Sequence, residues 1–185
     1  MELLDVIHTR HSIPKVKPDP IPKALIEELL NAAVQAPNHH RVRPWRFVVL
    51  QGEARDRLGE IMANSLKNRN PDVLEEALAV ERSRPRRAPL LIAVGVDKPS
   101  EPKVVEIENV CAAAAACQNL LLAAHALGLG AMWRTGPAAL DAQVKAFLGF
   151  APDQHLIGFL YIGYPDGEFK APERPSFEDR TIWMD

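Results

Sequence analysis

A short segment near the amino terminus combines four polar groups of the kind that bind phosphate. Between Thr9 and Lys15 the chain carries a guanidinium, an imidazole, a hydroxyl and an ammonium group, on Arg10, His11, Ser12 and Lys15. Well-formed charge-assisted hydrogen bonds from such donors contribute roughly 1.5–3 kcal/mol each. The same residues are typical of a solvated helix end, where Arg and His interact favourably with the helix dipole. The segment alone leaves both interpretations open.

A second polar segment, residues 36–45, joins an expected helix to an expected strand. It holds His39, His40, Arg41 and Arg43 between two prolines. An imidazole ring can donate from either nitrogen or stack on an aromatic ring, so this segment can line a site for an anionic or aromatic ligand. A polar surface loop is the alternative interpretation.

A third segment, residues 128–136, is rich in glycine and places Arg134 and Thr135 at the end of an expected strand. Glycine permits close approach of the backbone to a ligand, and Arg134 offers another partner for an anion. The segment lacks the GxGxxG fingerprint of dinucleotide-binding folds, which follows a first strand and opens a helix. An ordinary turn would have the same composition.

The spacing of apolar residues predicts the elements that position these segments. Helices are expected at residues 2–9, 23–35, 53–68, 72–82, 105–127 and 137–148. Strands are expected at residues 45–50, 89–96, 131–133 and 155–164. Prolines at positions 14, 18, 20 and 22 force an extended segment between the first two helices. Because no internal repeat or flexible linker interrupts the chain, one α+β domain is expected over residues 1–185.

The helix expected at residues 105–127 is apolar on nearly every face from Val110 onward. Such a helix must be buried on all sides, and a chain of 185 residues has little room for that. A homodimer is therefore expected. The proline- and charge-rich tail ends in Ile182, Trp183 and Met184, which favours an arm wrapped over the partner subunit.

Charge and hydropathy exclude two classes of partner. The formal net charge of −2 lacks the basic footprint of a nucleic-acid-binding protein. The most apolar stretch, residues 110–129, contains Gln118, Asn119 and His125, which favours a buried helix over a membrane span. The chain does not open with the charged and apolar regions of a secretion signal. No membrane partner is therefore expected.

The two cysteines predict a reducing environment. On a helix, Cys111 and Cys117 lie about 9 Å apart along the axis and point to different faces, so they cannot pair with each other. Two reduced cysteines fit a cytoplasmic protein. His39 and His40 are adjacent and lack further ligands nearby, so no metal site is expected.

The three polar segments, taken in order, carry a resemblance to a known family. A short helix runs into Arg10-His11-Ser12, the pair Ala36-Pro37 leads to PWRFVVL at the first strand, and an alanine-rich helix closes in LAAHALGLGAMW. This ordered set covers almost the whole chain and resembles the flavin-dependent nitroreductase family. The APNHH sequence and the chain length are similar to those of its short-chain branch.

The resemblance implies an α+β fold with a mixed sheet flanked by helices. It also implies an intertwined homodimer, with a C-terminal arm and two FMN molecules at the subunit interface. By position, Arg10, His11 and Ser12 would contact the phosphate, the ribityl chain or the ring edge of FMN.

Five further residues match flavin-contacting positions of the family. Gln35 and His39 match positions of the short-chain branch and would come from the other subunit. Trp133, Arg134 and Thr135 match the third flavin-contacting stretch, and Arg134 would contact the phosphate. These assignments follow from the resemblance and not from spacing.

The implied activity is that of an oxidoreductase. NAD(P)H would deliver hydride to the flavin N5 and leave, and an electron-poor acceptor such as a nitro compound or a quinone would then take the electrons, in a ping-pong mechanism. The flavin N5 would be the reactive centre, so no catalytic side chain is expected. A cation near the N1–C2 edge would stabilise the reduced ring, and Arg10 and Lys15 are candidates. Part of the nicotinamide nucleotide would lie near residues 121–126.

Two alternative functions stay open. One is a protein that stores or senses FMN with little turnover, and the other is a flavin enzyme with an acceptor such as an enal or a halogenated aromatic compound. The chain also departs from the family pattern. Pro14 stands where many relatives have a basic residue, and Arg41 and Arg43 stand where many have Asn and Gln. The basic run at residues 82–87 either meets the 2′-phosphate of NADPH or is a solvated loop.

Overall fold

The computed structural model describes residues 2–184. Its α-helices are α1 (Leu3–Thr9), α2 (Lys23–Ala33), α3 (Glu53–Arg69), α4 (Glu75–Ser83), α5 (Glu106–Ala126), α6 (Pro137–Leu140) and α7 (Ala142–Phe147). Its strands are β1 (Trp45–Leu50), β2 (Leu90–Val96), β3 (Gly130–Arg134) and β4 (His155–Gly163). Short 3-10 helices lie at His39–Arg41, Arg84–Arg87 and Glu178–Arg180. The α+β class is confirmed.

The four strands form one sheet in the order β1-β2-β4-β3, and every pairing is antiparallel. The sheet of the described chain is therefore antiparallel throughout, where a mixed sheet was expected. Strand β2 is central and buried at every position, which explains its uninterrupted apolar sequence LLIAVGV. Strand β3 is short and lies at one edge, so its outer side is free to meet other segments.

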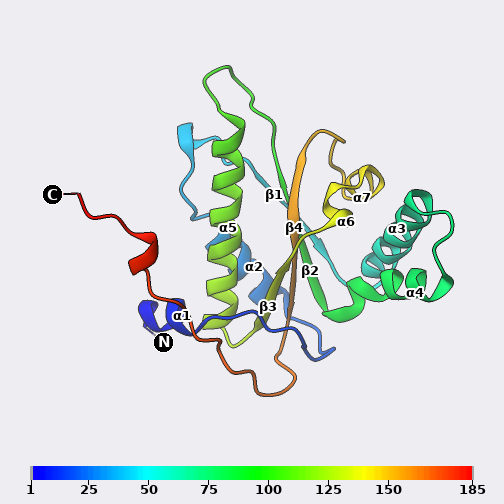
Figure 1. The fold of residues 1–185 in the computed structure, drawn as a ribbon, viewed down its shortest axis with the longest axis horizontal. Helices are drawn as coiled ribbons and strands as arrows, with labels where there is room; N and C mark the ends of the chain where they lie inside the picture. The colour runs from blue at the N-terminus through cyan, green and yellow to red at the C-terminus, as the bar shows by residue number, and fades with distance from the viewer. Residues whose placement is uncertain (1, 185) are drawn as a thin grey trace.

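Helices cover both faces of the sheet (Figure 1). Helices α2 and α5 pack on one face, where Leu29, Ile92 and Leu120 are fully buried in a common core. Helices α3, α6 and α7 cover the other face around a second core that includes Leu58 and Val144. Two apolar layers thus enclose the sheet, as in other α+β domains.

Helix α5 is the longest helix and runs the length of the sheet (Figure 1). By length and composition it could cross a membrane, but one side of it is packed in the core, where Ala113, Ala116 and Leu120 are fully buried. The side chain of Asn119 donates to the carbonyl of Ala32 on α2. These contacts pack one side of α5 against the core of the domain.

The opposite side of α5 has no cover within the described chain. Ile107 is 62% exposed, and Cys111 lies on the same side, whereas Cys117 is buried. The two thiols are both free and face different ways, as predicted. The expectation of burial on all sides is therefore not met by one chain alone.

Several boundaries differ from the sequence-based expectation. The helix expected at residues 137–148 is two helices, because Asp141 is extended and its carboxylate accepts hydrogen bonds from the N–H groups of Gln143 and Val144. This side chain starts a new helix at the point where the first one ends. The helix expected at residues 23–35 ends earlier, at Ala33, and the helix expected at residues 72–82 begins at Glu75.

The carboxy-terminal tail runs away from the body of the domain (Figure 1). Its last apolar side chains are nearly fully exposed, at 87% for Ile182, 80% for Trp183 and 93% for Met184. No residue in the range 2–184 covers these side chains. The surface that the tail is predicted to cover would therefore belong to a partner chain.

Candidate functional site

The segment that follows α1 is held against the edge of the sheet by β3. The backbone N–H of Ile13 donates to the carbonyl of Ala131 at 3.1 Å. A Cβ atom on Gly130 would lie 2.8 Å from a methyl carbon of Ile13, so only glycine allows this approach. The contact fixes the position of the preceding residues, Arg10 to Ser12.

His11 presents a buried nitrogen that has no hydrogen-bond partner among residues 2–184. Its Nδ1 lies 2.9 Å from the carbonyl oxygen of Thr9, and because a carbonyl can only accept, Nδ1 carries the proton. Nε2 of His11 is then an acceptor when the ring is neutral, and it is buried without a hydrogen bond. A buried acceptor of this kind fits a ligand that brings a hydrogen-bond donor.

His125, near the end of α5, faces this histidine. The two ring centroids are 6.5 Å apart with an interplanar angle of 63°. The Thr9 hydroxyl donates to the Asp5 carbonyl at 2.6 Å and lies 2.9 Å from Nε2 of His125, which therefore donates to it. Burial, followed by repulsion from His11 and Arg10, lowers the pKa of His125. The nearby charge of Arg10 thus favours the neutral form of His125.

The side chain of Arg174 contacts the backbone of Arg10. Arg174, from the tail, reaches the carbonyl oxygen of Arg10 with Nη2 at 3.5 Å. Burial and the charge of Arg174 lower the pKa of Arg10. Neither arginine forms an ion pair with any carboxylate of residues 2–184. Two adjacent cations without a counter-ion are suited to bind an anion.

Two cavities adjoin at His11. One has a volume of about 470 Å³ and is lined by residues that include His11, Ser12, Lys170, Arg174 and the acidic Glu168. The other, of about 310 Å³, is lined by residues that include His11, His125, Gly128 and Phe169. A polar space and a more apolar space therefore lie side by side, as a cofactor with a charged and an aromatic end requires.

Lys15 does not point at this site. Its ammonium group lies 2.6 Å from the carboxylate of Asp166, and both side chains are exposed. The N–H of Asp166 also donates to the carbonyl of Lys15, and Val16 forms a β-bridge with Pro165. Lys15 thus fastens the tail to the amino-terminal segment, which leaves Arg10 as the cation of that segment at the site.

His39 lies far from His11 within one chain. His39 is 3.9 Å from Glu108 near the start of α5, whereas His11 faces His125 near its end. These two positions on the helix are about 25 Å apart along its axis. Among residues 2–184, the side chain of Gln35 donates to the carbonyl of Asn31 on its own helix. One chain therefore places His39 apart from the group around His11.

The loop that carries His39 has an unusual backbone. His40, Arg41 and Arg43 adopt positive φ angles of 52°, 55° and 51°. The left-handed region disfavours residues with a side chain, so this loop stores conformational strain. The carboxamide oxygen of Asn38 accepts from the N–H of Arg43 and closes the loop at 2.9 Å.

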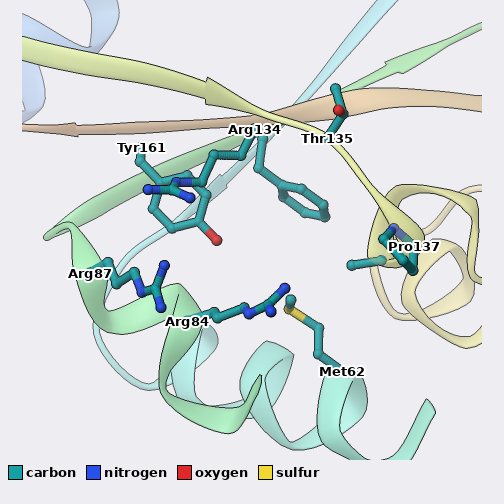
Figure 2. Close-up of a pocket in the computed structure, with 9 residues that line it drawn as sticks. Met62, Arg84, Arg87, Arg134, Thr135, Pro137 and Tyr161 are labelled. Carbon is teal, nitrogen blue, oxygen red and sulfur yellow. The ribbon is translucent and has the colours of Figure 1, made fainter. Parts of the chain in front are cut away.

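The third predicted stretch lies at the end of β3. The indole N–H of Trp133 donates to the carbonyl of Ile157 at 3.0 Å, so the indole is a structural part of the sheet. The Arg134 side chain points to the opposite face, where its guanidinium lies 5.5 Å from the centre of the Tyr161 ring (Figure 2). It is therefore absent from the group of donors around Arg10. Thr135 is exposed beside it.

The family model for the nitroreductase family matches residues 7–164. This range includes the three polar segments and all four strands. The chain belongs to the nitroreductase family.

Individual members of the nitroreductase family match this chain over nearly its full length. The relative named "Putative NAD(P)H nitroreductase YfhC" from Bacillus subtilis is 31% identical over 183 residues, covering 98% of this chain and 94% of the relative. A nitroreductase-like family protein from Bacillus cereus superposes with a TM-score of 0.87 at 26% identity, covering 100% of this chain and 96% of that one. A nitroreductase from Desulfovibrio desulfuricans, solved in complex with FMN, has a TM-score of 0.78 at 25% identity and covers 100% of this chain and 98% of its own.

Two residues that line the candidate site were missed by sequence reasoning. Lys170 and Arg174 lie in the proline-rich tail, about 160 residues away from Arg10 in sequence, and only the fold brings them to it. The available signal was the presence of two basic residues among the prolines of the tail. Tyr161 and Arg87 line a second cavity together, and their proximity depends on the antiparallel pairing of β2 with β4, which the sequence does not reveal.

Proposed function

We propose that this chain binds FMN at the cavities beside His11 and uses it as an NAD(P)H-dependent oxidoreductase. The observation that carries the proposal is the unpaired cation pair of Arg10 and Arg174 next to the orphaned Nε2 of His11. A phosphate would neutralise the two guanidinium groups, and a ribityl hydroxyl would donate to the imidazole nitrogen. The FMN complex of a structural relative supports the same assignment.

The individual residues would act by binding and orienting the cofactor. Arg10, Arg174 and Lys170 would hold the phosphate, and Ser12 would add a hydroxyl donor to it or to the ribityl chain. The backbone of Trp133 and Thr135, at the end of the edge strand, would meet the ring. The Arg134 side chain would not contribute to phosphate binding in the same chain, because it points to the other face of the sheet.

The second subunit would complete the site. Because His39 is about 25 Å from His11 along α5, it can reach the same FMN only from a partner chain, and Gln35 is proposed to act from that chain as well. The uncovered side of α5 and the exposed apolar tail would form the dimer interface. In a two-fold dimer each interface position occurs twice, so two equivalent sites would form.

Bound FMN supplies a ring that accepts a hydride and passes electrons to a second molecule. The protein would bind a reduced nicotinamide and an electron-poor acceptor in turn, in a ping-pong cycle. A nitro compound or a quinone is the proposed class of acceptor, and no side chain is needed as nucleophile or general base. The positive charge of Arg10 and Arg174 would favour the reduced, more negative cofactor. We place this activity in the cytoplasm.

The proposal is tested by titrating cofactor-free protein with FMN. Arg10→Ala and Arg174→Ala should each weaken FMN binding by about tenfold or more, because each removes a charge-assisted contact. Arg69→Ala is the matched control, since Arg69 is an exposed arginine at the far end of α3. The proposal is wrong if the natural chain does not bind FMN, or if Arg10→Ala binds it as tightly as Arg69→Ala.

A mixing experiment tests whether two chains share each site. Arg10→Ala and His39→Ala homodimers should both bind FMN weakly. After subunit exchange, random pairing gives mixed dimers in which one site carries both substitutions and the other carries neither. Tight binding should then return to about a quarter of the sites. If exchange is demonstrated and no tight sites return, no site combines Arg10 of one chain with His39 of the other.

A further inference from the structure

A separate cavity of about 300 Å³ lies on the face of the sheet that α3 and α6 cover, away from His11. Figure 2 shows its walls: Met62 from α3, Arg84 and Arg87 from the 3-10 helix before β2, and Arg134 and Thr135 from the end of β3. We call this cavity the arginine pocket. Its volume is at the lower end of the range for small-molecule sites.

The positive charge of the arginine pocket is only partly compensated. Arg84 pairs with the buried carboxylate of Glu81 at 3.0 Å. Arg87 and Arg134 have no ion pair or side-chain hydrogen bond with any residue in the described range 2–184. Two guanidinium groups that face one cavity without an acceptor are suited to bind an oxyanion through paired hydrogen bonds.

The neighbouring arginines behave differently. Arg82 pairs with Glu60 at 2.9 Å and with Glu75 at 3.3 Å, and Arg86 contacts Asp56 at 2.5 Å. The arginines of residues 82–87 therefore divide into two groups, those paired with carboxylates of α3 and α4 outside the pocket and those that line the pocket. Arg82 and Arg86 are neutralised by α3 and α4, and Arg87 is left facing the pocket.

The floor of the pocket is aromatic and apolar. The ring of Tyr161 lies beneath Arg134, and Figure 2 shows its hydroxyl pointing into the space that Arg84 and Arg87 face. Burial raises the pKa of Tyr161, so its hydroxyl keeps its proton and is available as a donor. Phe159, Met62 and Pro137 also line the cavity and add apolar surface to its walls. A ligand with a flat apolar body and one anionic group matches this arrangement.

We propose that the arginine pocket binds the carboxylate or phosphate group of a small molecule that reacts at the cofactor. The proposal rests on the proposed function, because Thr135 both lines the pocket and belongs to the strand end assigned to the flavin ring. A molecule with its anionic group at Arg87 and Arg134 would extend its other end toward that strand end. The anion has two possible sources, which are the electron acceptor and a phosphate of the nicotinamide nucleotide.

The test compares Arg87→Gln with Arg86→Gln in the FMN-loaded protein. Both variants lose one positive charge at adjacent positions, but only Arg87 lines the pocket, whereas Arg86 contacts Asp56. Binding of the inert anion 4-fluorobenzoate is followed by fluorine NMR, which requires no turnover. Arg87→Gln should weaken this binding by about tenfold, Arg86→Gln should leave it unchanged, and Arg87→Lys should give an intermediate value.

Kinetic measurements then identify the source of the anion. Dithionite-reduced protein is mixed with 4-nitrobenzoate or with neutral 4-nitrobenzyl alcohol, so that NAD(P)H is not involved. If the acceptor supplies the anion, Arg87→Gln slows reoxidation by the carboxylate about tenfold and leaves reoxidation by the alcohol unchanged. If the nucleotide supplies it, the variant instead raises the concentration of NAD(P)H needed for half-maximal reduction.

The proposal is overturned if Arg87→Gln and Arg86→Gln match each other in anion binding and in both half-reactions. Failure of NAD(P)H to reduce the natural protein would contradict the proposed function alone, since 4-fluorobenzoate binding and reoxidation after dithionite still report on the pocket. The two hypotheses therefore fail separately.

Discussion

Gly130 and Ile13 are in contact only because Gly130 has no side chain, since a Cβ atom there would lie 2.8 Å from Cγ2 and 2.9 Å from Cβ of Ile13. The contact sets the distance between the edge strand β3 and the segment that carries Arg10, His11 and Ser12. A backbone hydrogen bond between Ile13 and Ala131 holds the same arrangement. The proposed cofactor site therefore depends on a residue that would not itself touch the cofactor.

Gly130→Ala should displace this segment and weaken FMN binding by roughly tenfold, because overpacking at a close contact typically costs 1–3 kcal/mol. The measurement is a fluorescence titration of cofactor-free protein with FMN. Gly52→Ala is the control. Alanine is also disfavoured there, because the φ of Gly52 is 52°, but a Cβ atom at this position meets no described atom within 4 Å. Equal FMN affinities for the two variants would show that the contact does not position the site.

The stability of the cofactor-free protein should fall as the pH decreases below about 6.5, because of His125. Its pKa is lowered in the folded chain by burial and by the nearby His11 and Arg10, whereas the unfolded chain keeps a value near 6.5. Below that pH the unfolded state binds more protons, so folding is disfavoured. Urea unfolding at pH 5, 6 and 7 should show this slope, and His125→Gln should reduce it.

His8→Gln serves as the control for this pH dependence, because His8 is an exposed residue on α1. Addition of FMN should also reduce the slope in the natural protein, since the phosphate would offset the repulsion around His125. A slope that is the same in His125→Gln and His8→Gln would contradict the assignment to His125.

Lys15 should contribute little to FMN binding, because its ammonium group is held by Asp166. Lys15→Gln and Asp166→Asn should each change FMN affinity by less than about twofold, in contrast to Arg10→Ala. The hydrogen bond and charge of Lys15 keep the pKa of Asp166 below its ordinary value of 3.8. The ion pair is therefore intact at neutral pH and is lost only as the pH falls below 3.8. A large loss of affinity in Lys15→Gln at neutral pH would place the lysine at the flavin.

The two cysteines report on the proposed dimer interface. Burial raises the pKa of Cys117 to about 12, so it should not react with a disulfide reagent at pH 8 until the chain unfolds. Cys111 is exposed in one chain, on the uncovered side of α5. It should react slowly in a dimer and quickly after dilution to monomers, and Cys111→Ser should abolish the fast reaction. Fast labelling in a dimer verified by light scattering would exclude this side of α5 from the interface.

Much of the fold was predictable because local patterns determined it. The apolar sequences of β1 and β2 and the long apolar helix α5 appear within one or two residues of their expected bounds. The break at Asp141 could be read only from a side chain that caps the next helix, a signal that the apolar spacing hides. Strand direction could not be derived either, because helices and strands alternate in sequence although the sheet is antiparallel.

The site was predicted only in part, because it combines distant segments. Arg10, His11 and Ser12 lie in one short run, so their proximity was visible in the sequence. Arg174 reaches them through the path of the tail, and the direction of Arg134 depends on the register of β3 in the sheet. A one-residue change of register reverses every side chain of a strand, so residue type alone could not place this guanidinium.

The central claim is that this chain reduces a bound flavin with NAD(P)H. The most direct measurement is anaerobic mixing of the FMN-loaded protein with NADH or NADPH in a stopped-flow spectrometer, followed by addition of a nitro compound or a quinone. The account predicts that the visible flavin absorption band bleaches with at least one nucleotide and returns with the acceptor. Tight FMN binding without bleaching by either nucleotide would contradict it and would favour a protein that stores or senses FMN.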